Sequence, residues 1–173
     1  GGSSSWIGAV SRSGGILQVV STTKSDAFSA SIGSNSFSSN VTGLAATITP
    51  SSTSSKILVI TQLYGASGIS NYPIVTYRID RNGTPVGVGD LVGSRPQVTA
   101  KSWVVVNESN SQISSSATFL DSPATTSSLT YGVQLHNHDT TTQTYYLNRS
   151  SGDTNDRLGG RPISTITLME VAG

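Results

Sequence analysis

Residues 129–135 read Leu-Thr-Tyr-Gly-Val-Gln-Leu and carry the clearest alternation of apolar and polar residues in the chain. On an extended backbone successive side chains point to opposite faces, so the apolar residues of this stretch share one face. The pattern predicts a strand with one buried side. Residues 56–63, Lys-Ile-Leu-Val-Ile-Thr-Gln-Leu, predict a second strong strand, and their continuous apolar start indicates burial on both faces.

Shorter runs of β-branched and aromatic residues, separated by turn residues, predict further strands along the chain. Asn82-Gly83 lies between two of these runs and predicts a tight hairpin, because a type I′ turn needs positive φ at both central residues. No window has the apolar spacing of a helix. We predict strands over residues 16–20, 41–49, 56–63, 73–80, 84–88, 103–106, 114–120, 129–135, 144–148 and 163–171. About nine or ten antiparallel strands at this spacing predict an all-β fold, a jelly-roll β-sandwich whose last strand is central.

The length of the chain indicates how many domains it forms, and its charge and composition exclude some classes of protein. The 173 residues fit one domain, and we expect a flexible Gly/Ser-rich lead-in or stem end over residues 1–15, followed by the β-sandwich over residues 16–173. The net charge is +1 and the cations are scattered, which argues against sequence-independent binding of nucleic acid. No apolar run reaches the ~20 residues of a membrane span. The lack of cysteine excludes disulfides, thiolate zinc sites and cysteine nucleophiles.

Catalytic motifs are missing from the sequence. It contains no G-x-S-x-G elbow, no Walker loop and no H-E-x-x-H pair. Glycoside hydrolysis needs two carboxylates that flank one bond. Every carboxylate except Glu170 falls in a predicted turn or loop or, for Asp80, on the last residue of a predicted strand beside a turn, where Asp ordinarily accepts hydrogen bonds from its own backbone. We therefore expect a binding or structural module rather than an enzyme.

Two local patterns could hold a metal ion. His136 and His138 form a His-x-His pair, whose side chains share one face of an extended segment and have Asp139 beside them. Two imidazoles are too few to form a metal site within one chain, although three chains around a threefold axis would supply six. The alternative is that the two histidines are an exposed pair in a loop and bind nothing. Asp153 and Asp156 offer oxygen ligands for calcium or serve as ordinary turn residues. Beyond these hypotheses the sequence indicates no cofactor.

Predicted loops contain residues suited to the recognition of sugars. Such recognition needs an aromatic face and planar hydrogen-bonding side chains. Tyr72 is the best exposed aromatic candidate, because it follows a Gly/Ser/Asn stretch. The candidate receptor- or glycan-binding residues are Asn71, Tyr72, Arg95, Asn137, Asp139 and Arg157. Loops gathered at the end furthest from residue 1 would mark a receptor surface, whereas an end without a hollow or aromatic groups would indicate scaffolding.

Five segments, taken in order, resemble a recurrent domain of phage virion proteins. They are ILQVVSTTKSDAFS, VTGLAATITPSSTSSKILVI, ATFLDSPATTSSLTYGVQL, TYYLNRS and ISTITLMEV, within residues 16–173. The likeness is to the head domains of tail fibres and other minor structural proteins, particularly of marine and cyanobacterial phages. Those domains are similar to C1q- and TNF-like jelly rolls, which assemble about a threefold axis.

The resemblance implies a homotrimeric fibre head at the surface of a virion. Its partners would be a stem or other virion proteins and a glycan or protein on the host surface, with no nucleic acid and no membrane insertion. Some phage fibres hold iron with repeated His-x-His pairs on a threefold axis; here the pair occurs once. The alternatives are a structural capsid-fibre, decoration or tail-tip protein without a ligand, an enzyme that degrades polysaccharide, and a cellular carbohydrate-binding module.

Overall fold

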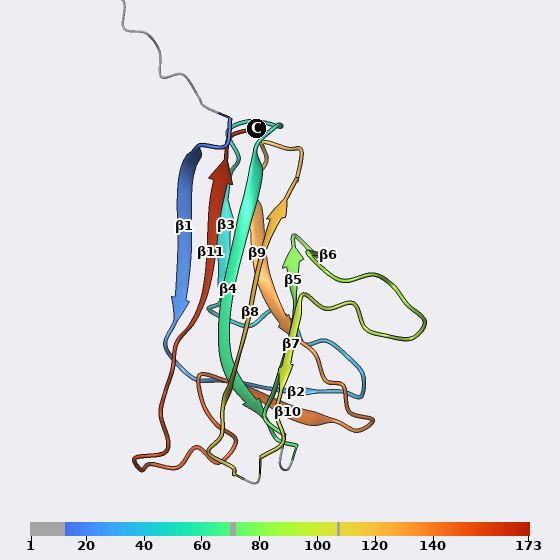
Figure 1. The fold of residues 1–173 in the computed structure, drawn as a ribbon, viewed down its shortest axis with the longest axis vertical. Coiled ribbons are helices and arrows are strands. Elements are labelled where there is room, and N and C mark those ends of the chain that lie inside the picture. The colour runs from blue at the N-terminus through green and yellow to red at the C-terminus, as the bar shows by residue number, and fades with distance from the viewer. Residues whose placement is uncertain (1–12, 70–71, 107) are drawn as a thin grey trace, which may run out of the picture.

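The computed structural model describes residues 13–69, 72–106 and 108–173, and these residues form strands and no helix (Figure 1). None of them therefore makes a helix long and apolar enough to cross a membrane. The strands are β1 (Ile16–Lys24), β2 (Phe28–Ile32), β3 (Ala45–Ile48), β4 (Lys56–Ser67), β5 (Ile74–Arg81), β6 (Thr84–Val86), β7 (Ala100–Trp103), β8 (Ile113–Asp121), β9 (Leu129–Leu135), β10 (Gln143–Leu147) and β11 (Ser164–Val171). The predicted all-β class is confirmed.

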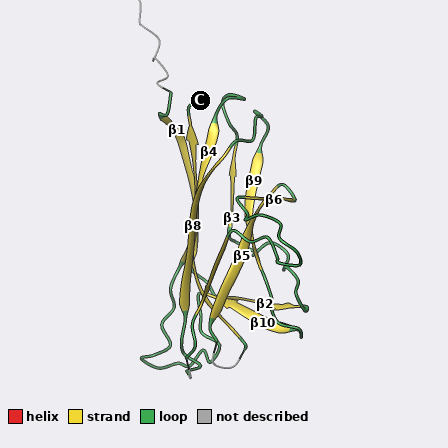
Figure 2. Ribbon diagram, turned by 45° about the vertical axis from the view of Figure 1, so that its right-hand side comes forward, coloured by secondary structure: helices red, strands yellow, loops and turns green. Residues whose placement is uncertain are grey.

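The strands form two sheets whose pairings are all antiparallel. The first sheet has the order β1-β11-β4-β10-β2, with β8 paired to β4; the second has the order β3-β9-β5-β6, with β7 paired to β5. The strands β1, β11, β4 and β8 of the first sheet run alongside the second sheet, and β10 and β2, which complete the first sheet, run across the lower part of the molecule (Figure 2). β11 lies between β1 and β4, which confirms that the last strand is central.

The core lies between the sheets and is built from alternate residues of each strand. The apolar residues of β9 confirm the predicted pattern, because Leu129, Tyr131, Val133 and Leu135 are at most 6% exposed. Tyr77 also reaches into the core, where its hydroxyl is 2.6 Å from Oγ1 of Thr61 on the opposite sheet. Burial raises the pKa of Tyr77 to about 12, so the hydroxyl keeps its proton for this hydrogen bond.

The prediction that β4 is buried on both faces is wrong for this chain. Ile57, Val59 and Leu63 are fully buried, whereas Leu58 and Ile60 between them are only half-buried. The reason is that β4 belongs to an antiparallel sheet with the core on one side only. Its continuous apolar sequence therefore places apolar side chains on the outside of the sandwich as well.

Several strand boundaries differ from the sequence prediction. β2 was not predicted, and it pairs with β10, which is more than a hundred residues away in sequence. The strand predicted over residues 41–49 is shortened to β3, because Gly43 makes a turn with a φ of 78°. The strand predicted at 103–106 ends at Trp103.

The Asn82-Gly83 hairpin is confirmed. Both residues have positive φ, 49° and 90°, as a type I′ turn requires. Nδ2 and Oδ1 of Asn82 bond Ser128 and Thr130, and the amide of Gly83 donates to Oδ1 of Asp80 over 2.7 Å. The turn residues therefore also fasten β5 to the neighbouring strand β9.

Candidate functional site

The chain enters the sandwich at the same end at which β11 finishes. The amide of Gly14 donates to the carbonyl of Ala172, and the amide of Ala172 donates to the carbonyl of Gly15, both over 2.8 Å. The other end of the sandwich, at the bottom of Figure 1, carries the loops that follow β4, β7, β9 and β10. We call this end the tip. The loops that the sequence singled out after β4, β9 and β10 thus lie at the end away from the chain entry.

Two hollows lie at the tip, on either side of Tyr72. The first, which we call the Glu108 hollow, has a volume of about 240 Å³ and is lined mainly by small polar residues and Glu108. The second, which we call the Trp103 hollow, has a volume of about 350 Å³. Its lining consists of Ile69, Tyr72, Ile74, Lys101, Trp103, His138 and Asp139. The tip thus combines concave surface with aromatic groups.

Tyr72 and Trp103 form an exposed aromatic pair in the Trp103 hollow. Their ring centroids lie 6.2 Å apart with an angle of 43° between the ring planes. Tyr72 is 39% exposed, as predicted, and Trp103 is 55% exposed. The loop holds Tyr72 through its backbone, which accepts from Oγ of Ser67 and donates to the carbonyl of Ile69. The sheet holds Trp103, which is opposite Ile74 on β5.

Lys101 and His138 supply polar groups to the same hollow. Lys101 is two residues before Trp103 on β7, so both side chains project from the same face. Nδ1 of His138 is 3.1 Å from the hydroxyl of Tyr145. Burial, and then the charge of Lys101, lower the pKa of His138, so its ring is neutral at pH 7. At neutral pH the hollow therefore contains a fixed cation and a neutral imidazole.

Asp139 directs its carboxylate into its own loop. Oδ1 accepts from the amide of Thr141 over 3.0 Å and from the hydroxyl of Thr141 over 3.1 Å. These hydrogen bonds hold the pKa of Asp139 below its usual range. The residue therefore shapes the loop between β9 and β10, and part of its capacity to accept hydrogen bonds is already used.

Asn137 is a correction to the sequence prediction. The side chain was expected on the binding surface, but it is fully buried. Its Nδ2 donates to the carbonyls of Ile32 and Gly33 over 2.9 Å and of Thr141 over 2.8 Å, and Oδ1 accepts from the amide of Asp139. Asn137 connects the loop between β9 and β10 to the end of β2, so it holds this loop of the tip in place from inside the molecule.

The two histidines lie in different surroundings. His136 is 1% exposed and packs on Phe37, with ring centroids 4.6 Å apart. Arg78 lies 3.8 Å from the centroid of the Phe37 ring. Burial is the main cause that lowers the pKa of His136 to about 4. A ring covered in this way cannot reach a metal shared with other copies, and the described residues contain no group of three or more His, Cys, Asp or Glu that could hold one.

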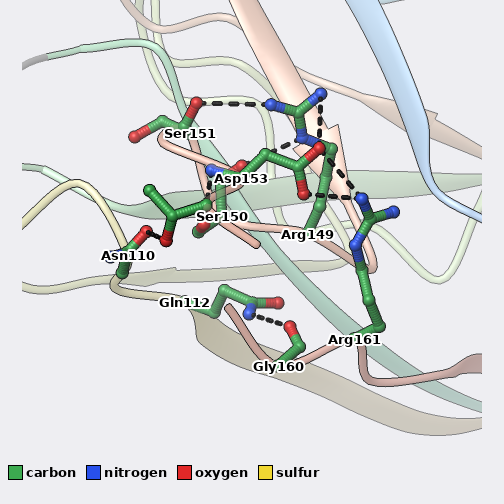
Figure 3. Close-up of polar contacts among 9 residues, drawn as sticks. Asn110, Gln112, Arg149, Ser150, Ser151, Asp153, Gly160 and Arg161 are labelled. Atoms are coloured by element: carbon green, nitrogen blue, oxygen red, sulfur yellow. Dashed lines mark hydrogen bonds and ion pairs between the residues drawn. The ribbon is translucent and has the colours of Figure 1, made fainter. Parts of the chain in front are cut away.

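In the loop between β10 and β11, Asp153 takes part in ion pairs and hydrogen bonds with residues near it in the sequence (Figure 3). The Asp153 carboxylate lies 2.8 Å from Nη2 of Arg161 and 3.5 Å from Nη1 of Arg149. Its amide donates to Oγ of Ser150 over 3.0 Å. Two guanidinium groups therefore neutralise Asp153, one of the two carboxylates on which the calcium hypothesis relies.

Asp156, Arg157 and Arg95 lie outside the two hollows. Oδ1 of Asp156 accepts from the amide of Leu158 over 2.7 Å, which is the turn role that the sequence also allowed. Arg157 is exposed on the same loop, and Arg95 is exposed on the loop between β6 and β7. Asn71 lies outside the described residues.

Lys101, Trp103 and Glu108 were not among the sequence candidates. Trp103 begins a predicted strand, and a tryptophan in a strand is ordinarily taken as core. The available signal was the spacing of Lys101 and Trp103, since residues two apart on a strand present a cation and an aromatic ring on one face.

A second surface, on the outside of the first sheet, carries a row of apolar side chains. Val19, Met169, Leu58 and Leu120 are directly opposite one another across β1, β11, β4 and β8. Val19 and Leu120 are 56% and 48% exposed, and the two residues between them are half-buried. The row therefore presents apolar surface from four adjacent strands.

The residues around this row are almost without charge. The outward side chains are Val19, Ser21 and Thr23 of β1, Thr165, Thr167, Met169 and Val171 of β11, Lys56, Leu58, Ile60, Gln62 and Tyr64 of β4, and Ser114, Ser116, Thr118 and Leu120 of β8. Lys56 is the one charged residue among them. We call this surface the uncharged face. A contiguous apolar area with a polar rim is typical of a protein–protein contact.

Comparison with known proteins finds no family model and no curated protein that matches this chain.

Proposed function

We propose that this chain is the head domain of a viral fibre, a homotrimeric jelly roll that attaches a virion to a glycan or protein on the host surface. The observation that carries the proposal is the placement of the aromatic hollows. Tyr72 and Trp103 lie at the tip, while the chain enters at the other end, where Gly14 bonds Ala172. A stem attached at the entry end would leave the tip facing the host.

The order of the strands supports the jelly-roll assignment. β3, β4 and β5 alternate between the two sheets along the chain, and β8, β9 and β10 do so again. Such repeated crossing between two antiparallel sheets is the arrangement of a jelly roll.

The uncharged face supports the homotrimer. Residues close to a threefold axis meet their own counterparts in the two other copies, so a like charge at that place would be repelled. The row from Val19 to Leu120 carries no charge and includes half-exposed apolar side chains. We assign this face to contact with the two other copies, which leaves the tip hollows at the periphery of the assembly free for a ligand.

Binding of the labelled chain to host cells tests the attachment role. We expect saturable binding that is lost in Trp103→Ala, because the substitution removes half of the aromatic pair. Absence of binding by a trimeric, folded chain would contradict attachment and favour a purely structural virion protein. Release of reducing ends from host envelope material, abolished by replacing a single carboxylate, would instead favour the enzyme.

A further inference from the structure

We propose that the Trp103 hollow binds an acidic saccharide, with a sugar ring against Tyr72 and Trp103 and the sugar carboxylate at Nζ of Lys101. This inference rests on the proposed attachment function and names its ligand class, a polysaccharide that contains uronic acids.

The aromatic pair provides the surface for a sugar ring. Trp103 is 55% exposed although it is the largest kind of apolar side chain, and nothing in the described part of the chain covers it. The two rings are inclined at 43° with centroids 6.2 Å apart, which is the contact range of a tilted aromatic pair. The trough for a sugar is therefore the open surface along the pair and not a slot between the two rings. The C–H groups of a pyranose ring pack well against such faces, while its hydroxyls remain directed to polar neighbours.

The charge of the hollow selects the kind of sugar. Lys101 is exposed in the lining, and the described residues place no carboxylate within ion-pair distance of its Nζ. The one carboxylate of the hollow, Asp139, accepts hydrogen bonds from Thr141 of its own loop through Oδ1. A ligand carboxylate at Lys101 would form a charge-assisted hydrogen bond, which is stronger than a bond to a neutral hydroxyl.

His138 adds a directional contact beside Lys101. Its Nδ1 is engaged by the hydroxyl of Tyr145, and no described residue engages its Nε2. A neutral imidazole can donate or accept through this atom, as a sugar hydroxyl requires.

The Glu108 hollow on the other side of Tyr72 sets the direction of the ligand. Its lining holds the carboxylate of Glu108 and several serine hydroxyls, and no cation. The Glu108 carboxylate has no cation beside it in this lining and disfavours a uronate there, whereas the Trp103 hollow holds Lys101 as well as the carboxylate of Asp139. The acidic group of the saccharide therefore belongs on the Lys101 side of Tyr72.

Titration calorimetry with matched saccharides tests the inference. The probes are tetrasaccharides of galacturonate, glucuronate, mannuronate and guluronate, each compared with its own methyl ester, which keeps the sugar and removes the charge. We expect at least one oligouronate to bind about tenfold more tightly than its ester, since one charge-assisted contact is worth that ratio. Lys101→Gln should abolish this preference by weakening binding of the oligouronate about tenfold more than binding of its ester, and Trp103→Ala should weaken both. Arg95→Gln removes an exposed cation outside both hollows and serves as the control.

The outcomes separate this inference from the proposed function. If no oligouronate binds more tightly than its ester, or if Lys101→Gln keeps the preference, the assignment of an acidic saccharide to the Trp103 hollow is wrong. If the same protein still binds host cells through Trp103, the attachment function stands with another ligand. If neither host cells nor saccharides bind, both proposals fail.

Discussion

Tyr72 and Trp103 reach the tip from separate elements, and their ring centroids meet 6.2 Å apart. Tyr72 follows β4 in a loop, while Trp103 closes β7 and pairs with Ile74 of β5. Neither ring belongs to the buried core, so the pair is not needed to complete the packing of the sandwich. Its place in a hollow at the end away from the chain entry is the observation on which the proposed attachment function rests.

The aromatic pair is predicted to act as a unit in ligand binding. Tyr72→Ala and Trp103→Ala should each weaken saccharide binding about tenfold, and the double variant should lose less than the sum of the two free energies, because each ring shapes the trough for the other. Calorimetry measures the coupling. Both rings are exposed, so the free energy of unfolding should change by only about 0.5 kcal/mol. Additive losses would show that the rings contact the ligand independently.

The uncharged face is predicted to hold the trimer together. Val19→Glu adds a charge at the β1 end of the apolar row, on the surface assigned to contact with the other copies, while the exposed side chain leaves the core of the chain intact. We expect the mass in solution to fall from three chains to one, as measured by analytical ultracentrifugation. Val92→Glu is the matched control, because Val92 is similarly exposed, at 49%, on the loop between β6 and β7. If both variants dissociate the trimer, or if neither does, the uncharged face is not the contact between the copies.

Glu170 is predicted to make stability depend on acid. It is 1% exposed, and its carboxylate accepts from the side chain of Gln18 and from the amide and hydroxyl of Ser51, over 2.6–2.7 Å. Burial raises the pKa of Glu170, but these hydrogen bonds outweigh it and bring the pKa from 4.5 to about 2. Because the folded pKa is depressed, the carboxylate stabilises the fold above about pH 4.5, and this contribution disappears as the pH falls towards 2.

Comparison with Glu170→Gln isolates that contribution. At neutral pH the variant should lose roughly 3 kcal/mol of unfolding free energy, and the difference from the native chain should vanish below about pH 2. Urea unfolding at a series of pH values measures both curves. A difference that stays constant from pH 6 to pH 2 would mean that the hydrogen bonds do not depend on the charge.

Asn137 is predicted to matter for stability rather than for contact with a receptor. Asn137→Ala leaves the carbonyls of Ile32, Gly33 and Thr141 without their buried donor, which should cost about 2–4 kcal/mol of unfolding free energy. The exposed Asn155 lies on the loop between β10 and β11, and Asn155→Ala should cost less than about 0.5 kcal/mol. Equal melting midpoints for the two variants would contradict the structural role.

Residues 129–135 show what could be predicted from sequence. Their period of two placed one apolar face in the core, and this needed no knowledge of the partner strands. β2 has the same period in Phe-Ser-Ala-Ser-Ile, but the run is short, and its partner β10 is remote in sequence. The continuous apolar residues of β4 gave a wrong prediction for a different reason. An antiparallel strand with apolar residues on its outward face has the same run of residues as a strand buried on both faces.

The tip shows what could not be predicted. Tyr72 was recognised from its Gly/Ser/Asn loop, yet the hollow beside it takes Trp103 from β7 and His138 from the loop after β9. No local pattern links these segments, since the antiparallel pairing of β5 with β7 and β9 is what brings them together. The prediction for Asn137 was wrong because the side chain of a polar loop residue can form hydrogen bonds with buried backbone groups as readily as it can with a ligand.

Competition for adsorption tests attachment through the tip most directly. Under the proposed function, a phage that displays this chain is mixed with host cells. Increasing amounts of the free native chain, or of Trp103→Ala with an equal melting midpoint, are added at equal concentrations. We predict that the native chain reduces adsorption in proportion to the fraction of host sites that it occupies, and that the variant has little effect. Adsorption unchanged by the native chain, or reduced equally by the variant, would contradict the account.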